Sequence, residues 1–449
     1  MTTRAANRPS VDRSTEEHPS GDRPLEDRPS AGRSRTGSPV SSPPSTSGQA
    51  DSGRPTSGRP TSGHPTSDRA AVETALAGLP RVVDLLAARA EEHDRDATFP
   101  YQGIEAVHEA GLLTLTVSRK YGGPGGSLAD TVRVLSQLGR GDASVAVVTA
   151  FTLLRHAEQA RLADWPTAGY RRLITESRRG PALVNTLRAE PGAGSGELPE
   201  TVARRDGDGW LLTGRKTYCT GAEALAWMAV TARTDEEEPR IGTFLVRGES
   251  EGLEIDPTWD QLGLRASASH DVVLDGVRVP ADLALGLGAR ESKDADAELS
   301  RAWHDLALSA VAIGVARAAE SWLVRFLNQR TPANLTEPLG TLPRYRCALG
   351  EIEAQLIGAE ELVEGLAPRV DRGEPDAVAR TGPAHLLATR AATTAVQQAV
   401  ALTGNPGLSR RHPLERYLRD VLSSRVHLAS DETVLEAAGR AALERGARP

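Results

Sequence analysis

One loop near the middle of the chain has the composition of a site where the backbone itself binds a ligand. Ala189 to Gly196 reads AEPGAGSG and follows a segment typical of a β-strand. Small residues let backbone N–H groups approach a flat, anionic or carbonyl-rich ligand closely. An ordinary glycine-rich turn has the same composition. The loop therefore predicts a ligand site only in combination with other segments.

Motifs for several other chemistries are incomplete. His108 and Glu109 begin HEAGL, which lacks the second histidine of a zinc-binding HExxH helix. Ser195 lies in GAGSGE, which is not the GxSxG of a hydrolase nucleophile. Tyr121 to Ser127, YGGPGGS, lacks the Lys-Ser/Thr ending of a phosphate loop, so we interpret it as a structural turn. We expect neither a metal site nor serine-hydrolase chemistry.

Charge and cysteine usage narrow the class of protein. The chain has 53 Lys and Arg against 60 Asp and Glu, a formal net charge of -7, and no basic stripe, so nucleic acid is not an expected partner. Cys219 and Cys347 are far apart without CxxC spacing, which favours a reducing cytoplasm. The most apolar stretches, Ser144 to Leu154 and Leu306 to Ala316, are shorter than the roughly twenty residues that span a bilayer. We expect a cytoplasmic protein without a membrane partner.

Residue patterns divide the chain into four parts. Residues 1–69 are rich in Ser, Pro, Arg and Gly, which predicts a disordered tail, either a plain solvated extension or a partner-binding segment. Residues 70–180 show helical spacing of apolar residues. Residues 181–290 contain short strand-like runs, including a hairpin around Asp206 to Gly209. Residues 291–449 return to helical spacing, with later helices expected near Arg344 to Val370, Ala377 to Leu402 and Leu414 to Ala442.

The expected fold class is multi-domain α+β. It comprises an N-terminal all-α domain, a middle β-domain of barrel or sandwich type, and a C-terminal four-helix bundle. Leu299, Trp303, Leu306, Ala310 and Ile313 share one face of the first bundle helix by their spacing. The glycine-rich loop at Ala189 falls within the β-domain.

Several segments in order resemble the acyl-CoA dehydrogenase superfamily. After the AEPGAGSG loop come Thr213 to Gly221, TGRKTYCTG, and Leu262 to Pro280, LGLRASASHDVVLDGVRVP. FPYQGIEAVHEAGLL and YGGPGG match in the first domain, and TGNPGLSRRHPLERYLRD, Thr403 to Asp420, matches in the last. The resemblance covers nearly the whole chain after the tail and extends to the flavin-dependent monooxygenase branch. It implies the same three-domain fold and a bound FAD, with FMN as the alternative.

The resemblance also implies which residues hold the flavin. Tyr218 would lie against the isoalloxazine face, and Thr220 would hydrogen-bond near flavin N5 or O4, a contact that supports hydride acceptance. The bundle of such proteins pairs with another subunit, so we expect a homodimer or homotetramer. The remaining implied cofactor-binding residues belong to the first loop and to segments that approach a neighbour's flavin: Glu190, Gly192, Gly194, Ser195, Arg330, Gly404 and Gly407.

The sequence departs from the family at the catalytic base. Many members carry a Tyr-Glu pair after the Arg-Asp that here is Arg419-Asp420, but His427 and Leu428 fill those two positions. Other members carry the base on the first bundle helix, where counting places His304, followed by Asp305. An unperturbed histidine pKa of about 6.5 suits a base at neutral pH, although a histidine at this position can equally be structural.

Two further departures concern the substrate. Asp305 replaces an arginine that helps to hold acyl-CoA, and Gly196 replaces an aspartate. A reversed charge would repel an anionic cofactor tail, so CoA is less certain as the thiol carrier. Only Arg330, in QRTPAN, remains of an Arg-x-x-Phe-Gly segment that contacts flavin across subunits.

Three functional hypotheses follow. The first is a flavin dehydrogenase that oxidises the Cα–Cβ bond of an acyl thioester, on CoA or a carrier protein, with His304 or Asp305 as base. The second is a reduced-flavin monooxygenase of the same fold, acting on a small molecule, in which His427 donates a hydrogen bond to reacting oxygen. The third is a flavin-binding or interaction protein without catalysis. The partner would be an electron acceptor for the first and a flavin reductase for the second.

Overall fold

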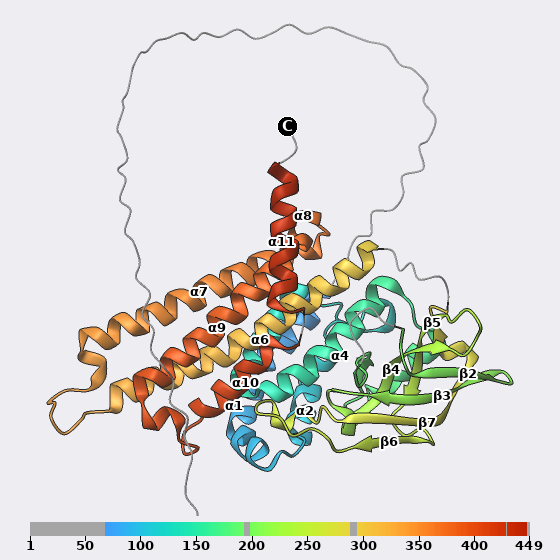
Figure 1. Cartoon of the computed structure of the whole chain (residues 1–449). Coiled ribbons are helices and arrows are strands. Elements are labelled where there is room, and N and C mark those ends of the chain that lie inside the picture. The colour runs from blue at the N-terminus through green and yellow to red at the C-terminus, as the bar shows by residue number, and fades with distance from the viewer. Residues whose placement is uncertain (1–67, 193–197, 288–293, 428, 447–449) are drawn as a thin grey trace, which may run out of the picture. The chain divides into compact units, whose positions relative to one another are not determined.

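The computed structural model describes residues 68–192, 198–287, 294–427 and 429–446. The predicted tail, apart from its last two residues, lies outside these ranges. So do Gly194 and Ser195 of the glycine-rich loop and Leu428. Within the described residues, helices come first, a sheet follows, and helices return, as the sequence predicts (Figure 1).

The first part of the described chain is helical. Its α-helices are α1 (Arg69–Asp96), α2 (Tyr101–Glu109), α3 (Leu128–Gly141), α4 (Ala143–Leu162) and α5 (Thr167–Glu176), with 3₁₀ turns η1 (Leu112–Thr114) and η2 (Arg119–Tyr121) between them. Side chains at the start of helices fix two of these boundaries. Ser127 and Asp130 form a capping box at α3, and Asp142 accepts the backbone N–H groups of Ser144 and Val145 at α4. The YGGPGGS segment is a packed turn, because a Cβ at Gly126 would meet Leu115 at 2.8 Å.

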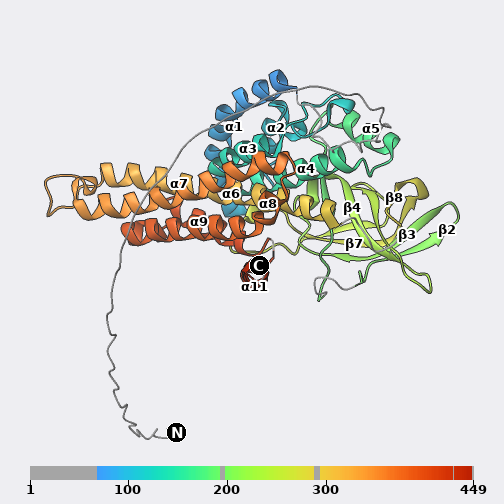
Figure 2. The same ribbon diagram turned by 90° about the horizontal axis from the view of Figure 1, so that it is seen from above.

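The middle part is a single twisted sheet (Figure 2). Its order is β6-β7-β3-β2-β4-β5-β8, and β1 pairs in parallel with β4. The predicted hairpin is confirmed as β2 and β3, joined at Gly207 and Asp208. The strands are β1 (Leu183–Leu187), β2 (Val202–Asp206), β3 (Gly209–Lys216), β4 (Leu225–Thr234), β5 (Ile241–Arg247), β6 (Leu253–Asp256), β7 (Asp271–Pro280) and β8 (Ala284–Leu285).

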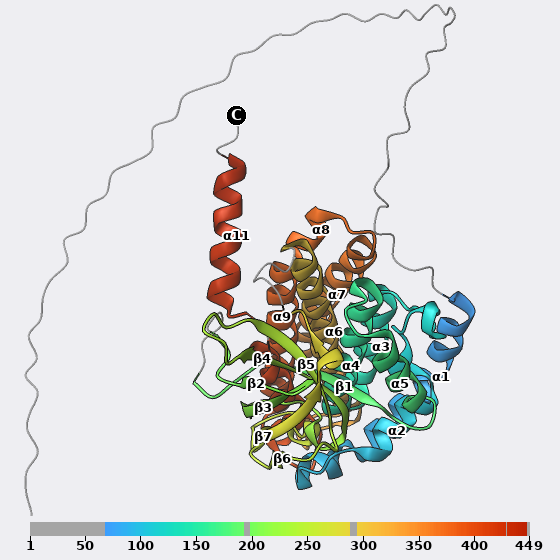
Figure 3. The same cartoon turned by 90° about the vertical axis from the view of Figure 1, so that its right-hand side faces the viewer.

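The last part is a helical bundle. Its helices are α6 (Asp294–Gln329), α7 (Pro343–Asp371), α8 (Pro375–Ala379), α9 (Thr381–Thr403), α10 (Leu414–Leu422) and α11 (Asp431–Gly446). The prediction of one continuous helix from Leu414 to Ala442 was wrong. The first helix, α10, ends at Leu422, and a second helix, α11, begins at Asp431. The Ser430 hydroxyl accepts the Thr433 N–H at the start of α11. No residue of α11 is buried, and the helix extends beyond its neighbours (Figure 3).

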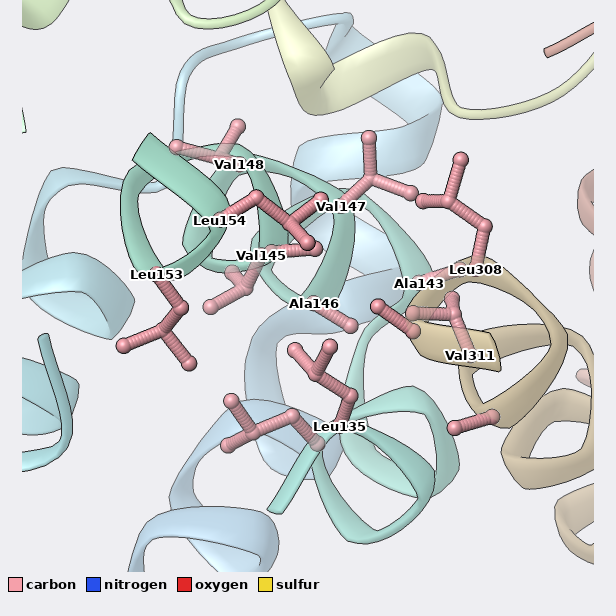
Figure 4. Close-up of a cluster of buried hydrophobic side chains, with 14 of the residues drawn as sticks. Leu135, Ala143, Val145, Ala146, Val147, Val148, Leu153, Leu154, Leu308 and Val311 are labelled. Atoms are coloured by element: carbon pink, nitrogen blue, oxygen red, sulfur yellow. The ribbon is translucent and has the colours of Figure 1, made fainter. Parts of the chain in front are cut away.

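Close helix packing joins the first part to the bundle. A Cβ at Gly139 of α3 would meet the Val311 carbonyl of α6 at 2.6 Å, so only glycine permits this approach. Leu135, Ala146, Leu308 and Val311 meet in the same buried cluster (Figure 4). The part of α6 from residue 295 to residue 329 is long and apolar enough to cross a membrane, but 72% of its most apolar stretch is buried inside the protein. This burial identifies α6 as a core helix.

Candidate functional site

A pocket of about 650 Å³ lies where α4, β1 and α6 meet. The first half of α6 supplies one wall, α4 supplies a second, and β1 closes the third side. His427, which follows α10, completes the lining. The pocket residues are Phe151, Leu154, Arg155, Glu158, Leu162, Asn185, Thr186, Arg188, Asp296, Ala297, Ser300, Arg301, His304 and His427. We call this the functional pocket, because it contains two of the three predicted catalytic residues.

His304 projects from α6 into the functional pocket with a fixed tautomer. Its Nδ1 lies 2.8 Å from the Ser300 carbonyl oxygen one helical turn earlier. Because a carbonyl oxygen only accepts hydrogen bonds, Nδ1 carries the proton and Nε2 keeps its lone pair in the neutral ring. Burial lowers the pKa of His304, and the hydrogen bond to Ser300 opposes that shift only in part. The imidazole is therefore neutral at pH 7 and has an acceptor nitrogen available.

His427 lines the same pocket from a different part of the chain. Burial, reinforced by the nearby His385, lowers the pKa of His427 to about 4. The ring also borders a small apolar recess beside Leu308, Val315 and Asp420. The functional pocket thus brings together two neutral imidazoles that are far apart in the sequence.

Asp305 faces away from the functional pocket. Its Oδ2 accepts a hydrogen bond of 2.8 Å from the Thr381 hydroxyl of α9, and its backbone carbonyl accepts one from Ser309. Burial raises the pKa of the Asp305 carboxyl to about 6. The side chain therefore occupies the interface between α6 and α9, while its neighbour His304 reaches the pocket. A catalytic role for Asp305 stays a prediction.

Carboxylates in the functional pocket are poorly suited to act as a base. Glu158 forms an ion pair with Arg155, whose other nitrogen lies 2.6 Å from Asp164. Burial alone would raise the pKa of Glu158, but the positive charges of Arg155 and Arg188 outweigh it and hold that pKa below its usual value. Glu158 therefore stays ionised and paired, and His304 is the better acceptor of a substrate proton.

The segment predicted to hold flavin carries an unusual aromatic residue. Tyr218 has φ 55°, in the left-handed region, and is 65% exposed. Trp259 meets its ring edge-on with centroids 6.5 Å apart. A left-handed conformation disfavours a bulky residue, and an exposed aromatic face buries no apolar surface. The exposed ring is available to a flat aromatic ligand, and contact of Tyr218 with a flavin stays a prediction.

Thr220 forms the polar side of the same segment. Its Oγ1 accepts a 3.0 Å hydrogen bond from the Ser269 hydroxyl, and its carbonyl accepts one of 3.1 Å from Asn185. Asn185 also lines the functional pocket, so this side chain joins the flavin segment to the pocket. The donor set, an exposed ring beside buried hydroxyls, fits the polar edge and flat face of a flavin. Sequence patterns had not singled out Asn185, Ser269 or Trp259, because each acts through a contact distant in sequence.

Family models match all three parts of the described chain. The N-terminal domain of acyl-CoA dehydrogenase matches residues 82–159, its middle domain residues 186–277, and its C-terminal domain residues 306–432. YdbM of Bacillus subtilis (strain 168), an acyl-CoA dehydrogenase-like protein, is 30% identical over 371 residues, covering 81% of this chain and 95% of YdbM. This chain belongs to the acyl-CoA dehydrogenase family. The family is flavin-binding, and the three-domain fold predicted from the sequence is confirmed.

Other proteins similar to this acyl-CoA dehydrogenase family member differ in their named activities or ligands. The 3-(aryl)acrylate reductase of Clostridium sporogenes is 27% identical, over 74% of this chain and 87% of the reductase. KijD3, solved with FMN and dTDP-3-amino-2,3,6-trideoxy-4-keto-3-methyl-D-glucose, is 26% identical with a TM-score of 0.71, covering 84% and 94% of the two chains. A nitrososynthase from Micromonospora carbonacea is 25% identical with a TM-score of 0.73, covering 84% and 98%. The family relationship therefore fixes flavin oxidoreductase chemistry but spans several substrates.

Glu190, at the start of the glycine-rich loop, has structural partners. Its carboxylate accepts the backbone N–H groups of Glu200 at 2.6 Å and Thr201 at 3.0 Å. Lys216 donates to it at 2.5 Å, and the two side chains are 2% and 0% exposed. The carboxylate thus ties the loop to β3, which leads into Tyr218. Gly192 has φ 74°, which suits glycine at the loop's turn. Cofactor contacts from Glu190 and Gly192 stay predictions.

Three other predicted cofactor residues lie at the opposite end of the bundle. Arg330 follows the end of α6, about 39 Å along the helix from His304 at 1.5 Å per residue. Gly404 and Gly407 follow α9, which runs in the same direction and meets Asp305 near its own start. Gly407 packs against Thr403 too closely for a Cβ. None of the three lines the functional pocket of this chain, so their predicted contacts require a second subunit.

Proposed function

We propose that this protein is a flavin-dependent dehydrogenase that oxidises the Cα–Cβ bond of an acyl thioester with His304 as the base. The observation that carries this proposal is the tautomer of His304, whose Nδ1–H is held by the Ser300 carbonyl while Nε2 remains an acceptor in the functional pocket. A base must accept a proton from the carbon beside the thioester carbonyl. His304 supplies the acceptor in the place of the glutamate that many family members use.

In this reaction the Cα–H bond breaks and its proton passes to Nε2 of His304. The resulting imidazolium keeps its Nδ1–H bond to Ser300, which stabilises the positive charge and prevents the ring from turning. The Cβ hydride leaves with its electron pair, and the flavin, when bound, supplies the two-electron acceptor. Tyr218 and Thr220 would hold the flavin, and Asn185 fixes the Thr220 backbone beside the pocket.

Two arginines support an anionic substrate. Arg188 of the segment after β1 and Arg301 of α6 line the functional pocket and are exposed. Within the described part of the chain, neither has an ion-pair partner. A phosphate of a CoA or carrier-protein thioester offers both a counter-ion. We further propose FAD as the cofactor, a cytoplasmic location, and a homodimer or homotetramer, since Arg330 and Gly404 lie far from their own pocket.

Anaerobic flavin reduction tests the base. Acyl thioesters of several chain lengths are mixed with the flavin-loaded protein, and loss of flavin absorbance is followed by stopped flow. His304→Ala should lower the reduction rate about a hundredfold or more, the usual contribution of general-base catalysis. His427→Ala, which alters the same pocket without removing the base, is the matched control and should act more weakly. Equal rates for His304→Ala and the unchanged protein, with flavin bound, would rule out His304 as the base.

A reduced-flavin monooxygenase is the second candidate. It is favoured by the pairing of two neutral imidazoles in a pocket whose buried carboxylate is already engaged by arginine. His427 would donate a hydrogen bond to reacting oxygen, and similarity to KijD3 and the nitrososynthase makes an amine a suitable acceptor. The test supplies reduced flavin and oxygen. In this case His427→Ala, rather than His304→Ala, should lower product yield and release hydrogen peroxide.

A further inference from the structure

A second cleft, of about 490 Å³, lies on the N-terminal helical part. It is formed by the 3₁₀ turn η2 and the C-terminal part of α5 from Arg171 onward, together with the segment that follows α5. It shares no lining residue with the functional pocket. Its lining comprises Arg119, Lys120, Tyr121, Gly122, Arg171, Ile174, Thr175 and Arg178. We call it the basic cleft, because four of these eight residues are cationic.

The four cations of the basic cleft have no carboxylate partner among the residues that the structure describes. Arg119, Lys120, Arg171 and Arg178 are all exposed, and no ion pair joins any of them to another described residue. Among the residues the structure describes, no carboxylate lines the cleft. The chain as a whole has a net charge of -7, so the positive charge of this cleft is opposite in sign to the net charge of the molecule. Like charges gathered in one concavity repel one another unless an anion is present.

The carboxylate of Glu176, the last residue of α5, is bonded to residues outside the basic cleft. It is the acidic residue of α5, yet its oxygens accept hydrogen bonds from Trp227 at 2.8 Å and from Arg247 at 2.7 Å. Both partners belong to the β-domain. Arg172, adjacent to Arg171, also lies 3.2 Å from Glu176. The acidic side chain thus neutralises arginines outside the basic cleft and leaves those inside it uncompensated.

Helix stabilisation explains only part of this pattern. Cations near the C-terminus of a helix interact favourably with its dipole, which suits Arg178 just after α5 but not Arg171, which lies in the middle of that helix. Arg119 and Lys120 belong to a separate turn that precedes α3, so the dipole of α5 gives no reason for their position. Gly122 has φ 84°, and a Cβ there would meet the Arg178 guanidinium at 3.2 Å. The absence of a side chain at Gly122 therefore leaves room for the Arg178 guanidinium beside the turn.

We propose that the basic cleft binds a small molecule carrying two or more phosphate groups. Arginine forks pair bidentately with phosphate oxygens, and three arginines with one lysine carry enough positive charge to neutralise a diphosphate. A volume of about 490 Å³ is that of a small-ligand site, whereas nucleic acid requires an extended basic stripe. Tyr121, held edge-on against Tyr170 with ring centroids 4.7 Å apart, offers an aromatic wall for a nucleoside base.

Calorimetric titration of the flavin-loaded, full-length protein tests this site. The probes are inorganic pyrophosphate and adenosine diphosphate, each measured at low and at physiological salt. Arg178→Gln should weaken binding of both probes at least tenfold, the loss expected for one charge-assisted hydrogen bond. The matched control is Arg179→Gln, because Arg179 is the adjacent exposed arginine and does not line the cleft. It should change affinity less than twofold. Tighter binding of adenosine diphosphate than of pyrophosphate would support a contact with Tyr121.

Four results would overturn the proposal. The first is absence of saturable binding of either probe at millimolar concentration. The second is equal weakening by Arg178→Gln and Arg179→Gln, which would indicate diffuse charge attraction. The third is weakening by Arg188→Gln alone, which would place the ligand in the functional pocket. The fourth is binding to vesicles that contain a phosphoinositide without binding to either soluble probe. Because no assay uses turnover, these results are independent of the reaction proposed above.

Discussion

The buried ion pair between Lys216 and Glu190 should stabilise the β-domain. It should also hold in place the segment around Tyr218 that is predicted to bind flavin. We consider Lys216→Met, which keeps the length of the side chain and removes its charge. Breaking a buried pair by removing one partner typically costs about 3–5 kcal/mol, because the remaining charge is left uncompensated. Glu190 keeps the N–H groups of Glu200 and Thr201, which partly solvate it. We therefore expect the lower end of that range, about 3 kcal/mol.

Urea unfolding of Lys216→Met, of Glu190→Gln and of the double variant that combines them measures this cost. Lys216→Met should lower the free energy of unfolding by about 3 kcal/mol, and adding Glu190→Gln should recover at least about 1 kcal/mol, because no buried charge then remains. Arg278→Met is the control on the same sheet. Its pair with Asp206 is exposed, so its loss should cost under about 1 kcal/mol.

Flavin affinity should respond in the same order. The N–H of Thr217, the residue after Lys216, donates to the Ala189 carbonyl at 2.9 Å, so the glycine-rich loop and the Tyr218 segment are held together at this point. Lys216→Met should therefore raise the flavin dissociation constant, whereas Arg278→Met should not. If Lys216→Met costs no more than Arg278→Met, the buried pair contributes little and the reasoning is refuted.

Three other predictions concern the cofactor, the base and the assembly. Thr220→Val should shift the flavin spectrum and weaken flavin binding by about 1 kcal/mol, and an unchanged spectrum would place the ring elsewhere. Since burial lowers the pKa of His304 and the base acts when neutral, the anaerobic reduction rate should be flat near pH 7 and fall with acid only below pH 6.5; His304→Ala should abolish this acid limb, and a limb that persists would assign it to another group. Light scattering at micromolar concentration should show a dimer or tetramer, and a flavin-loaded monomer would contradict the predicted cross-subunit contacts of Arg330 and Gly404.

Local patterns predicted the fold better than they predicted the site. The hairpin at Gly207 and the long bundle helices follow from turn residues and apolar spacing, which act over short stretches of chain. No turn residue or change in apolar spacing predicted that the helix ends after Leu422. Asp420 is buried there and accepts the Leu264 N–H at 2.8 Å, so a contact across 156 residues fixes the chain just before the break.

In the functional pocket, too, motif spacing predicted some residues, whereas others are fixed by contacts between residues far apart in the sequence. His304 and His427 were predicted because each fills a position defined by motif spacing, and the structure places both in one cavity, while their catalytic roles stay predictions. The orientation of Asp305 depends on Thr381, 76 residues away, and only the packed α6 and α9 reveal it. Asn185 could not be singled out from the sequence, because the hydrogen bond it makes is to the backbone of Thr220, 35 residues away.

The left-handed backbone at Tyr218 means that selection for heat resistance and selection for catalysis would favour different residues at this position. A non-glycine residue in this conformation costs roughly 1–2 kcal/mol. Tyr218→Gly should therefore make the flavin-free protein more resistant to heat, while removing the ring on which the cofactor would stack. A laboratory evolution experiment that screens only for thermal survival of the apoprotein would be expected to drift toward glycine here. Screening with flavin present would reverse that direction, since a ligand that binds the folded state alone stabilises whichever variant holds it more tightly.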